Sequence, residues 1–283
     1  MSVNSSSAIA DETPVPSRTS VLEHAVPLAP AFEFIPRSLT YRCAGDVAYP
    51  QDGELLLWRF RPEWHLVSKD EAYARLSKAE LARVKSHPNP ALGKRFAVGR
   101  AVMREILAEM LGCAPGEVEL SEDERGQLRL AQDDARQPVE IAIAYAGIWI
   151  VIGVSTTSVG LATRVPTLPD NAADGHADAS NAPRRMRLNG SSVEMRSRVR
   201  HDSLTSGAGR PLLNADACVL QQDSASFVID TVGAMRWHIL DLPMPGTICA
   251  AAAVAQPLTR VLAFGWAGRD GRAIAGRAST ADF

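Results

Sequence analysis

Several features that would place this chain of 283 residues in a class at once are missing from its sequence. No stretch approaches the roughly 20 apolar residues of a membrane-spanning helix, so we expect no membrane partner. The formal net charge of -2 lacks the basic excess that nucleic-acid binding needs, so we expect no nucleic-acid partner. The four cysteines form no CxxC pair, which argues against a zinc knuckle and fits reduced, buried thiols.

The first residues also lack the pattern of a secretory signal. Residues 1–20 are rich in Ser, Thr and Pro, without a basic start followed by an apolar core. The six histidines never approach metal-ligand spacing with one another. A chain of this length can bury a sizeable core. These observations predict a cytoplasmic globular protein.

Composition divides the chain into five segments. Residues 1–36 are rich in Ser, Pro and Ala and have little periodicity, which is typical of a disordered tail. Residues 167–183 are rich in Asp, Asn and Ala with almost no bulky apolar residue, which is typical of a linker or mobile loop. We therefore predict a disordered tail at 1–36, a first half of one domain at 37–166, a linker at 167–183, a second half at 184–266 and a frayed tail at 267–283.

Periodicity predicts helices and strands in both halves. The clearest helix is 94–111, where apolar residues recur near the i, i+3, i+4 spacing and Gly112 offers a C-terminal cap. A polar, helix-favouring segment covers 77–85. Each half thus has a helical part followed by strands, which predicts an α+β protein with two pseudo-symmetric halves. The predicted strands are 54–60, 117–120, 127–130, 139–146, 148–155 and 159–165, then 226–230, 236–242, 247–255 and 260–266.

Several of these segments, taken in order, resemble the larger, monomeric phosphopantetheinyl transferases that activate peptide synthetases and polyketide synthases in secondary metabolism. They are the strand at 55–60, the sequence LSKAE at 76–80 and the sequence KRFAVGRAVMR at 94–104. The resemblance covers roughly residues 54–264 in segment order. It implies a monomer with a 4'-phosphopantetheinyl transferase-like fold, in which each half carries a helical part and an antiparallel sheet.

The similar helix of the family carries a basic residue that meets the 3'-phosphate of coenzyme A. The resemblance assigns this role to Arg95, with Arg100 and Arg104 as weaker companions. An arginine fork suits a phosphate, so the assignment is chemically sound. The alternative is an ordinary solvated helix face. That alternative stays open for Arg95 and is favoured for Arg104.

The family's phosphate-binding strand and turn are only partly kept. A Gly-Lys-Pro turn corresponds to Gly126-Gln127-Leu128, which keeps the glycine and loses the lysine. A Ser-His-Ser-Gly strand end corresponds to Ala144-Tyr145-Ala146-Gly147. Tyr145 can still donate one hydrogen bond, although a buried tyrosine more often packs its ring and satisfies its hydroxyl locally. The coenzyme A-binding residues implied by the resemblance are Arg95, Arg100, Gly126, Gln127, Tyr145 and Arg164.

The metal-binding acids of the family are replaced here. Its Gly-Val-Asp-Ile-Glu motif, which coordinates magnesium, corresponds to Gly160-Leu161-Ala162-Thr163-Arg164. Ala162 and Arg164 should share one face of a strand, and neither can ligate a hard cation. A further family motif, Trp-x-x-Lys-Glu-Ala, is missing between residues 184 and 211, although residues 207–209 are similar to the small-residue turn that follows it. We therefore predict no metal-ligating residue.

Arg164 suggests a sharper hypothesis. A guanidinium at a former cation site can pair directly with a diphosphate and replace the charge of the ion. The alternative is that Arg164 points to solvent or pairs with a nearby acid such as Asp123 or Glu124.

These departures set the functional expectation. In the active family a carrier-protein serine attacks the diphosphate of coenzyme A and adenosine 3',5'-bisphosphate leaves. Losing the metal alone should cost on the order of a thousandfold in rate, and losing a base about a hundredfold more. We expect a transferase-like protein with impaired catalysis that binds coenzyme A, an acyl or peptidyl carrier protein, or both. The alternatives are an active transferase, which would need magnesium, and a non-catalytic structural or interaction protein.

Overall fold

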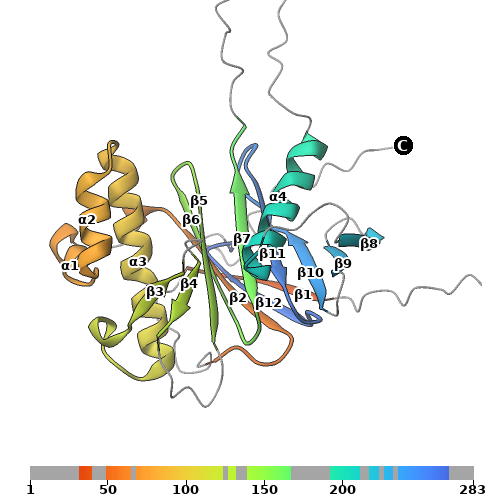
Figure 1. Ribbon diagram of the computed structural model, residues 1–283, viewed down its shortest axis with the longest axis horizontal. Coiled ribbons are helices and arrows are strands. Elements are labelled where there is room, and N and C mark those ends of the chain that lie inside the picture. Colours follow the sequence, from red (N-terminus) through yellow and green to blue (C-terminus); the bar gives the residue numbers. More distant parts are fainter. Residues whose placement is uncertain are drawn as a thin grey trace, which may run out of the picture.

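The computed structural model describes residues 32–39, 49–64, 68–123, 127–131, 139–166, 192–210, 217–222, 226–231 and 235–267. They form a mixed α+β protein with several sheets (Figure 1). None of the helices in these ranges is both long and apolar enough to cross a bilayer.

The helices flank the strands on two sides of the molecule (Figure 1). They are α1 (Lys69–Ala74), α2 (Lys78–Ser86), α3 (Pro90–Leu111) and α4 (Ser192–Ala208), with short 3-10 turns η1 (Pro62–Trp64) and η2 (Pro115–Glu117). The strands are β1 (Glu33–Arg37), β2 (Glu54–Phe60), β3 (Leu120–Glu122), β4 (Leu128–Leu130), β5 (Glu140–Ala146), β6 (Trp149–Ser155), β7 (Val159–Arg164), β8 (Ala217–Gln222), β9 (Ser226–Thr231), β10 (Arg236–Asp241), β11 (Cys249–Val254) and β12 (Arg260–Phe264).

The strands form two five-stranded sheets and one small hairpin. The first sheet has the order β1-β12-β2-β6-β5, the second has the order β7-β11-β10-β9-β8, and β3 pairs with β4. Strand β12 runs parallel to both β1 and β2, whereas all the other pairs are antiparallel. The expectation of purely antiparallel sheets is therefore wrong for the first sheet. A local hydrophobic pattern carries no information on the direction of a partner that comes from the far end of the chain.

The two sheets exchange strands between the halves of the sequence. Strand β7, inside the predicted half 37–166, belongs to the second sheet, and β12, inside 184–266, belongs to the first. The order of elements repeats: β2 is followed by helices, the β3-β4 hairpin, β5 and β6, and β7 is followed by α4, the β8-β9 pair, β10 and β11. The sheet orders β2-β6-β5 and β7-β11-β10 match in the same way.

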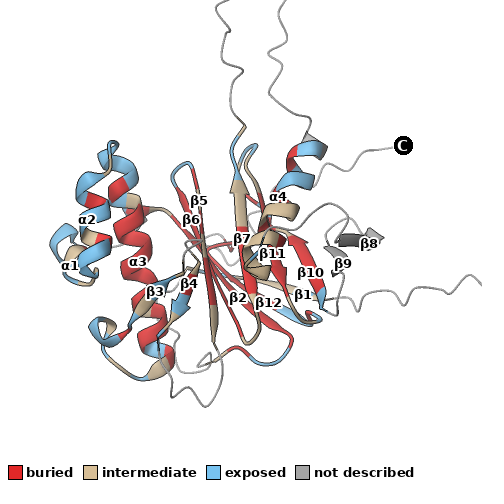
Figure 2. Ribbon diagram, viewed as in Figure 1, coloured by how far each residue is buried: buried red, intermediate tan, exposed pale blue. Residues whose placement is uncertain are grey.

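The core lies in three apolar layers between four layers of structure (Figure 2). Helix α3 packs against one face of the first sheet, the two sheets pack face to face, and α4 packs against the second sheet. Successive side chains of a strand point to opposite faces, so Leu56 and Trp58 meet α3 while Leu55 and Leu57 meet the second sheet. Strand β2 is buried along its whole length for this reason.

Local capping explains where the helices around the candidate site begin and end. Helix α3 starts four residues before the predicted 94–111, because the Asn89 side chain accepts hydrogen bonds from the first turn and Pro90 occupies the first helical position. Its predicted end is confirmed: Gly112 is the C-cap with φ of 69°. In α2, Ser77 and Glu80 form a reciprocal capping box.

Helix α4 lies at the start of the predicted second half 184–266, for which we expect a helical part before the strands. It approaches the backbone of β7 closely at Gly160. A Cβ at Gly160 would lie 2.8 Å from the Cα of Gly207 and closer still to the Ser203 carbonyl oxygen. Gly207 in turn leaves room for the Trp237 ring, 2.6 Å from where its own Cβ would be. Small residues on both elements therefore set the height of α4 above β7.

Three predicted boundaries differ from the structure or fall outside it. Strand β1 overlaps the end of the predicted tail 1–36, where its pairing with β12 orders it. The predicted strand 117–120 is the turn η2 followed by β3. The predicted linker 167–183 lies outside the described residues, as do residues 268–283 of the predicted frayed tail.

Candidate functional site

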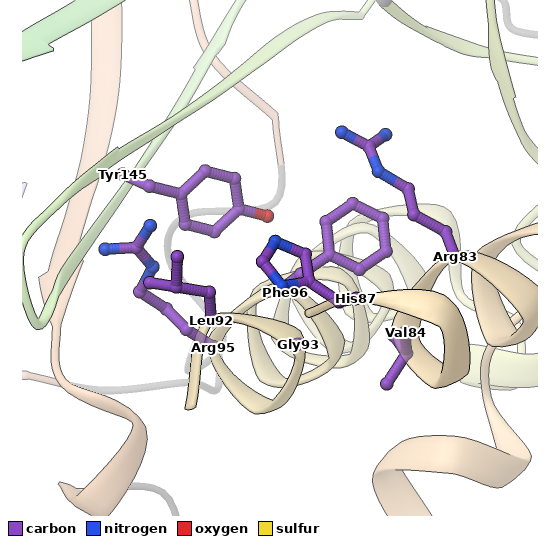
Figure 3. A pocket seen from close by; sticks show the side chains of 8 residues that line it. All are labelled: Arg83, Val84, His87, Leu92, Gly93, Arg95, Phe96 and Tyr145. Atoms are coloured by element: carbon purple, nitrogen blue, oxygen red, sulfur yellow. The ribbon is translucent and has the colours of Figure 1, made fainter. Parts of the chain in front are cut away.

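A cavity of about 130 Å³ opens between α2, the start of α3 and the end of β5. This is far smaller than the about 300–1,000 Å³ of pockets that hold drug-sized ligands, so it suits one anionic group rather than a whole nucleotide. Figure 3 shows the guanidinium groups of Arg83 and Arg95 on either side of the Tyr145 hydroxyl. The lining residues are Arg83, Val84, His87, Leu92, Gly93, Arg95, Phe96 and Tyr145.

The lining is basic and contains no carboxylate. Arg95 donates from Nη1 to the carbonyl oxygen of Gly147, at the turn between β5 and β6. Its Nε is buried without a hydrogen-bond partner, and burial lowers the pKa of Arg95. Its guanidinium carbon lies 5.2 Å from the centre of the Tyr145 ring, and that of Arg83 lies 4.6 Å from the centre of the Phe96 ring. Aromatic faces thus hold two guanidinium groups beside the cavity.

The Tyr145 hydroxyl is a further polar group at the cavity, in addition to His87 and the two arginines. It is buried and has no hydrogen-bond partner in the structure. Gly99 of α3 makes room for it, since a Cβ there would lie 2.9 Å from the hydroxyl oxygen. Burial raises the pKa of Tyr145 to about 12, against the opposing charges of neighbouring arginines. The group is therefore protonated at neutral pH and can donate a hydrogen bond to an anion.

An ionic network that is buried at Glu80, Arg100 and Arg104 lies beside the cavity. Arg104 donates to both carboxylate oxygens of Glu80, at 3.3 and 2.8 Å, and Arg100 pairs with Glu122 and lies 3.6 Å from Glu80. Arg83 also reaches Glu122, at 3.3 Å. Arg83, Arg100 and Arg104 share these two glutamates, so the network carries an excess of one positive charge, and Arg95 at the cavity adds another. Arg100, a predicted ligand-binding residue, is nearly inaccessible and supports the site electrostatically rather than lining it.

Replacing Tyr145 with Phe separates the two interpretations of this residue. If the hydroxyl is kept for a ligand, its loss should raise the free energy of unfolding by roughly 1 kcal/mol, because an unsatisfied buried group disappears. The same change should weaken phosphate-ligand binding by about tenfold. Thermal melts and titration with coenzyme A measure the two effects. A variant that is less stable than the wild type and binds equally well would show that Tyr145 serves packing alone.

A second group of predicted residues lies on the face of β7 that α4 covers. Ala162 packs against the cluster formed by Val199, Leu204 and Trp237. Arg164 places both Nε and Nη2 on Oδ2 of Asp202 in α4, at 2.8 and 2.7 Å. The alternative considered for Arg164, an ion pair with a nearby acid, is present, with Asp202 as that acid. Glu124 lies outside the described residues. The pair is partly exposed, with 44% of the Arg164 side chain accessible.

The cavity and the β7–α4 face are neighbours rather than one cleft. Thr163, on the opposite face of β7 from Ala162 and Arg164, donates from Oγ1 to the backbone carbonyl of Tyr145 at 2.8 Å. This bond joins the two strands that carry the predicted residues. Neither Ala162 nor Arg164 lines the cavity.

The predicted turn residues are placed elsewhere. The Gln127 backbone N–H donates to Asp123 at 2.9 Å, and its side-chain oxygen lies near Gly209, just beyond the end of α4. Gln127 does not line the cavity. Gly126 lies outside the described residues.

Sequence reasoning missed four residues of the two regions. Arg83 and His87 are four positions apart at the end of α2, a spacing that places both on one helix face, and Phe96 follows Arg95 directly. Asp202 lies two helical turns before Gly209. The small-residue turn at 207–209, which the sequence did identify, is therefore the signal that could have led to Asp202. No Trp-x-x-Lys-Glu-Ala run is needed to supply a carboxylate here.

The arrangement offers donors for an anion and not ligands for a cation. Within the described ranges, no three His, Cys, Asp or Glu side chains come together as a metal site. Ala162 has no donor atom, and Arg164 repels cations and pairs with Asp202. The residues present therefore do not fit a divalent cation on this face.

A comparison with known proteins finds a partial similarity. No family model matches the chain. A stretch of 77 residues is 38% identical to the 4'-phosphopantetheinyl transferase HetI of Nostoc sp. (strain PCC 7120 / SAG 25.82 / UTEX 2576). This stretch is 26% of the chain and 31% of that relative, so less than a third of the relative's length is matched. It supports a likeness to the phosphopantetheinyl transferases at the level of the superfamily.

Proposed function

We propose that this chain is a phosphopantetheinyl transferase-like protein of the cytoplasm that binds coenzyme A through its phosphates and transfers the phosphopantetheine arm poorly. Its protein partner would be an acyl or peptidyl carrier protein. The observation that carries the proposal is the basic cavity at Arg83, Arg95 and Tyr145, beside a strand whose acidic positions hold Ala162 and Arg164. The partial similarity to a named transferase supports the same assignment.

The cavity is suited to the 3'-phosphate of coenzyme A. Arg95 donates to the neutral Gly147 carbonyl, so a phosphate that displaces this contact gains a charge-assisted hydrogen bond. Tyr145 supplies a neutral donor and Arg83 a second charge. The cavity volume fits a phosphate group, and the rest of the ligand would then extend outside the cavity.

The diphosphate would lie toward the end of β7. The bond from Thr163 to the Tyr145 backbone places that strand end next to the cavity, and Arg164 is its terminal, partly exposed residue. A guanidinium there contributes charge without the coordination that orients reacting phosphates. Binding would thus persist while the rate of transfer falls. We also infer that the repeated order of elements from β2 to β6 and from β7 to β11 reflects two pseudo-symmetric halves of one transferase-like fold.

Calorimetric titration tests this function directly. Coenzyme A should bind equally well in magnesium and in EDTA, and 3'-dephospho-coenzyme A should bind about 10- to 100-fold more weakly, as expected for lost charged hydrogen bonds. Arg95→Ala should remove most of the difference between the two ligands. Absence of binding, or binding that requires magnesium, would overturn the proposal.

Substitution of Asp202 tests the proposal through an expected gain in coenzyme A affinity. It neutralises Arg164, so Asp202→Asn should free the guanidinium and strengthen coenzyme A binding by about threefold to tenfold. The matched control is Asp241→Asn, which breaks the pair that Asp241 makes with Arg200 of the same helix. The control should leave the affinity unchanged. A weaker affinity in Asp202→Asn would show that the carboxylate, not Arg164, serves the ligand.

A further inference from the structure

The polar lining of the cavity includes a side chain to which the proposed function assigns no part, His87. It is the C-cap residue of α2 and is half-buried. Figure 3 shows its imidazole ring pointing toward the Tyr145 hydroxyl, among the side chains that line the cavity. A histidine at this place can act in two ways: as part of the link between α2 and α3, or as a group that contacts the ligand.

The link between α2 and α3 fixes the position of the His87 ring. Pro88 and Pro90 have no backbone N–H, so Asn89 between them offers the one backbone donor of this short link. The Asn89 N–H donates to Nδ1 of His87 at 3.0 Å. The two helices also approach closely here, since a Cβ on Gly93 of α3 would lie 3.6 Å from the Cβ of His87. The ring is therefore held from both its stem and its Nδ1 edge.

The hydrogen bond at Nδ1 assigns the tautomer of His87. Because Nδ1 accepts a hydrogen bond, it carries a lone pair and no proton. A neutral imidazole has one N–H, which must then be on Nε2. In a doubly protonated ring the Nδ1–H would face the Asn89 N–H, donor against donor, so the observed contact is that of the neutral ring. The ring makes no second hydrogen bond to any of the described residues, which leaves Nε2–H for the cavity.

We infer that His87 is a further binding residue of the cavity, which donates a hydrogen bond from Nε2 to an oxygen of a terminal phosphate group. The inference rests on the proposed function for the molecule that carries this phosphate, coenzyme A. Tyr145 supplies one neutral donor from β5, and His87 supplies a second from the end of α2. A phosphate with three free oxygens can accept from both and still pair with a guanidinium, whereas a carboxylate has only two oxygens. The pair of neutral donors thus favours a terminal phosphate over a carboxylate.

Two substitutions of His87 separate ligand contact from a structural role. In His87→Gln the amide nitrogen can reach the position of Nε2. In His87→Asn the shorter side chain reaches only the position of Nδ1, where its oxygen can still accept from the Asn89 N–H. In calorimetric titration, His87→Asn should weaken coenzyme A binding by about tenfold, and His87→Gln should bind within about threefold of the wild type. Neither substitution should change the binding of 3'-dephospho-coenzyme A. A His87→Asn variant that binds coenzyme A as tightly as the wild type would overturn the inference.

Nuclear magnetic resonance of the full chain labelled with nitrogen-15 histidine separates this inference from the proposed function. The signals of His87 are identified among those of the six histidines by their loss in His87→Asn. They should show the proton on Nε2, and inorganic phosphate should shift the Nε2 signal. A response to inorganic phosphate without any coenzyme A binding would contradict the proposed function and leave the role of His87 standing. A proton on Nδ1, or an Nε2 signal that neither inorganic phosphate nor coenzyme A moves, would show that His87 serves the link between the helices alone.

Discussion

Gly160→Ala should lower the free energy of unfolding by about 3 kcal/mol or more. The added methyl group would overlap the backbone of α4 at Ser203 and Gly207, and a backbone cannot move aside as a flexible side chain can. Helix α4 would have to lift from β7, which would also pull Asp202 away from Arg164. Urea denaturation measures the loss of stability, and near-ultraviolet circular dichroism reports the changed surroundings of Trp237.

Gly116→Ala is the matched control for this prediction. Gly116 lies in η2, and a Cβ there would have no neighbour within 4 Å. Its substitution should change the free energy of unfolding by less than about 0.5 kcal/mol. Equal stability of the two variants would contradict the close approach of α4 to β7.

Introducing acids at two positions of β7 should create a divalent-cation site. In Ala162→Asp combined with Arg164→Glu, two carboxylates join Asp202 on the face between β7 and α4. Three carboxylates without a cation repel one another, so the variant should be less stable than the wild type in EDTA. Manganese or magnesium should then raise its melting temperature, by the equivalent of about 2.7 kcal/mol when the cation is at 100 times its Kd.

The triple variant that adds Asp202→Asn tests the role of the third acid. It should show a much smaller melting shift with either cation, and the wild type should show none. If the double and triple variants respond alike, Asp202 does not belong to this face in solution. If neither variant responds, carboxylates at positions 162 and 164 do not form a divalent-cation site on this face.

Elements with strong local signals could be predicted from the sequence. The apolar spacing of α3 and its Gly112 cap identified that helix to its last residue, and the runs at β2, β5 and β6 predicted their strands. A helical part was expected in the second half, but the bounds of α4 could not be predicted because it buries few apolar residues. Its contact with β7 depends on Gly160 and Gly207, and glycine adds nothing to a hydrophobic pattern. The parallel pairing of β12 with β2 could not be predicted, because the sequence of one strand does not indicate the direction of a partner that is distant along the chain.

Contacts between distant segments also limit what the sequence reveals about the candidate site. Arg95 and Tyr145 do lie together at one cavity, as their assignment to one ligand requires. The resemblance placed Arg164 on the same ligand, yet the pairing of Arg164 with Asp202 spans 38 residues. Arg59 shows this limit most clearly, since its buried guanidinium donates to the carbonyls of Pro243 and Gly265 and burial lowers its pKa to about 10. Within the sequence it is an unremarkable polar residue between two strand hydrophobics.

We propose that this chain binds coenzyme A through arginines and lacks the metal coordination that transfer of its phosphopantetheine arm requires. The most direct measurement is intact-protein mass spectrometry of apo carrier domains after incubation with the protein, coenzyme A and magnesium. The carrier mass should stay unchanged on a time scale on which an active transferase completes the reaction. If the carrier gains the mass of the phosphopantetheine arm as fast as with an active transferase, the proposed impairment of transfer is wrong.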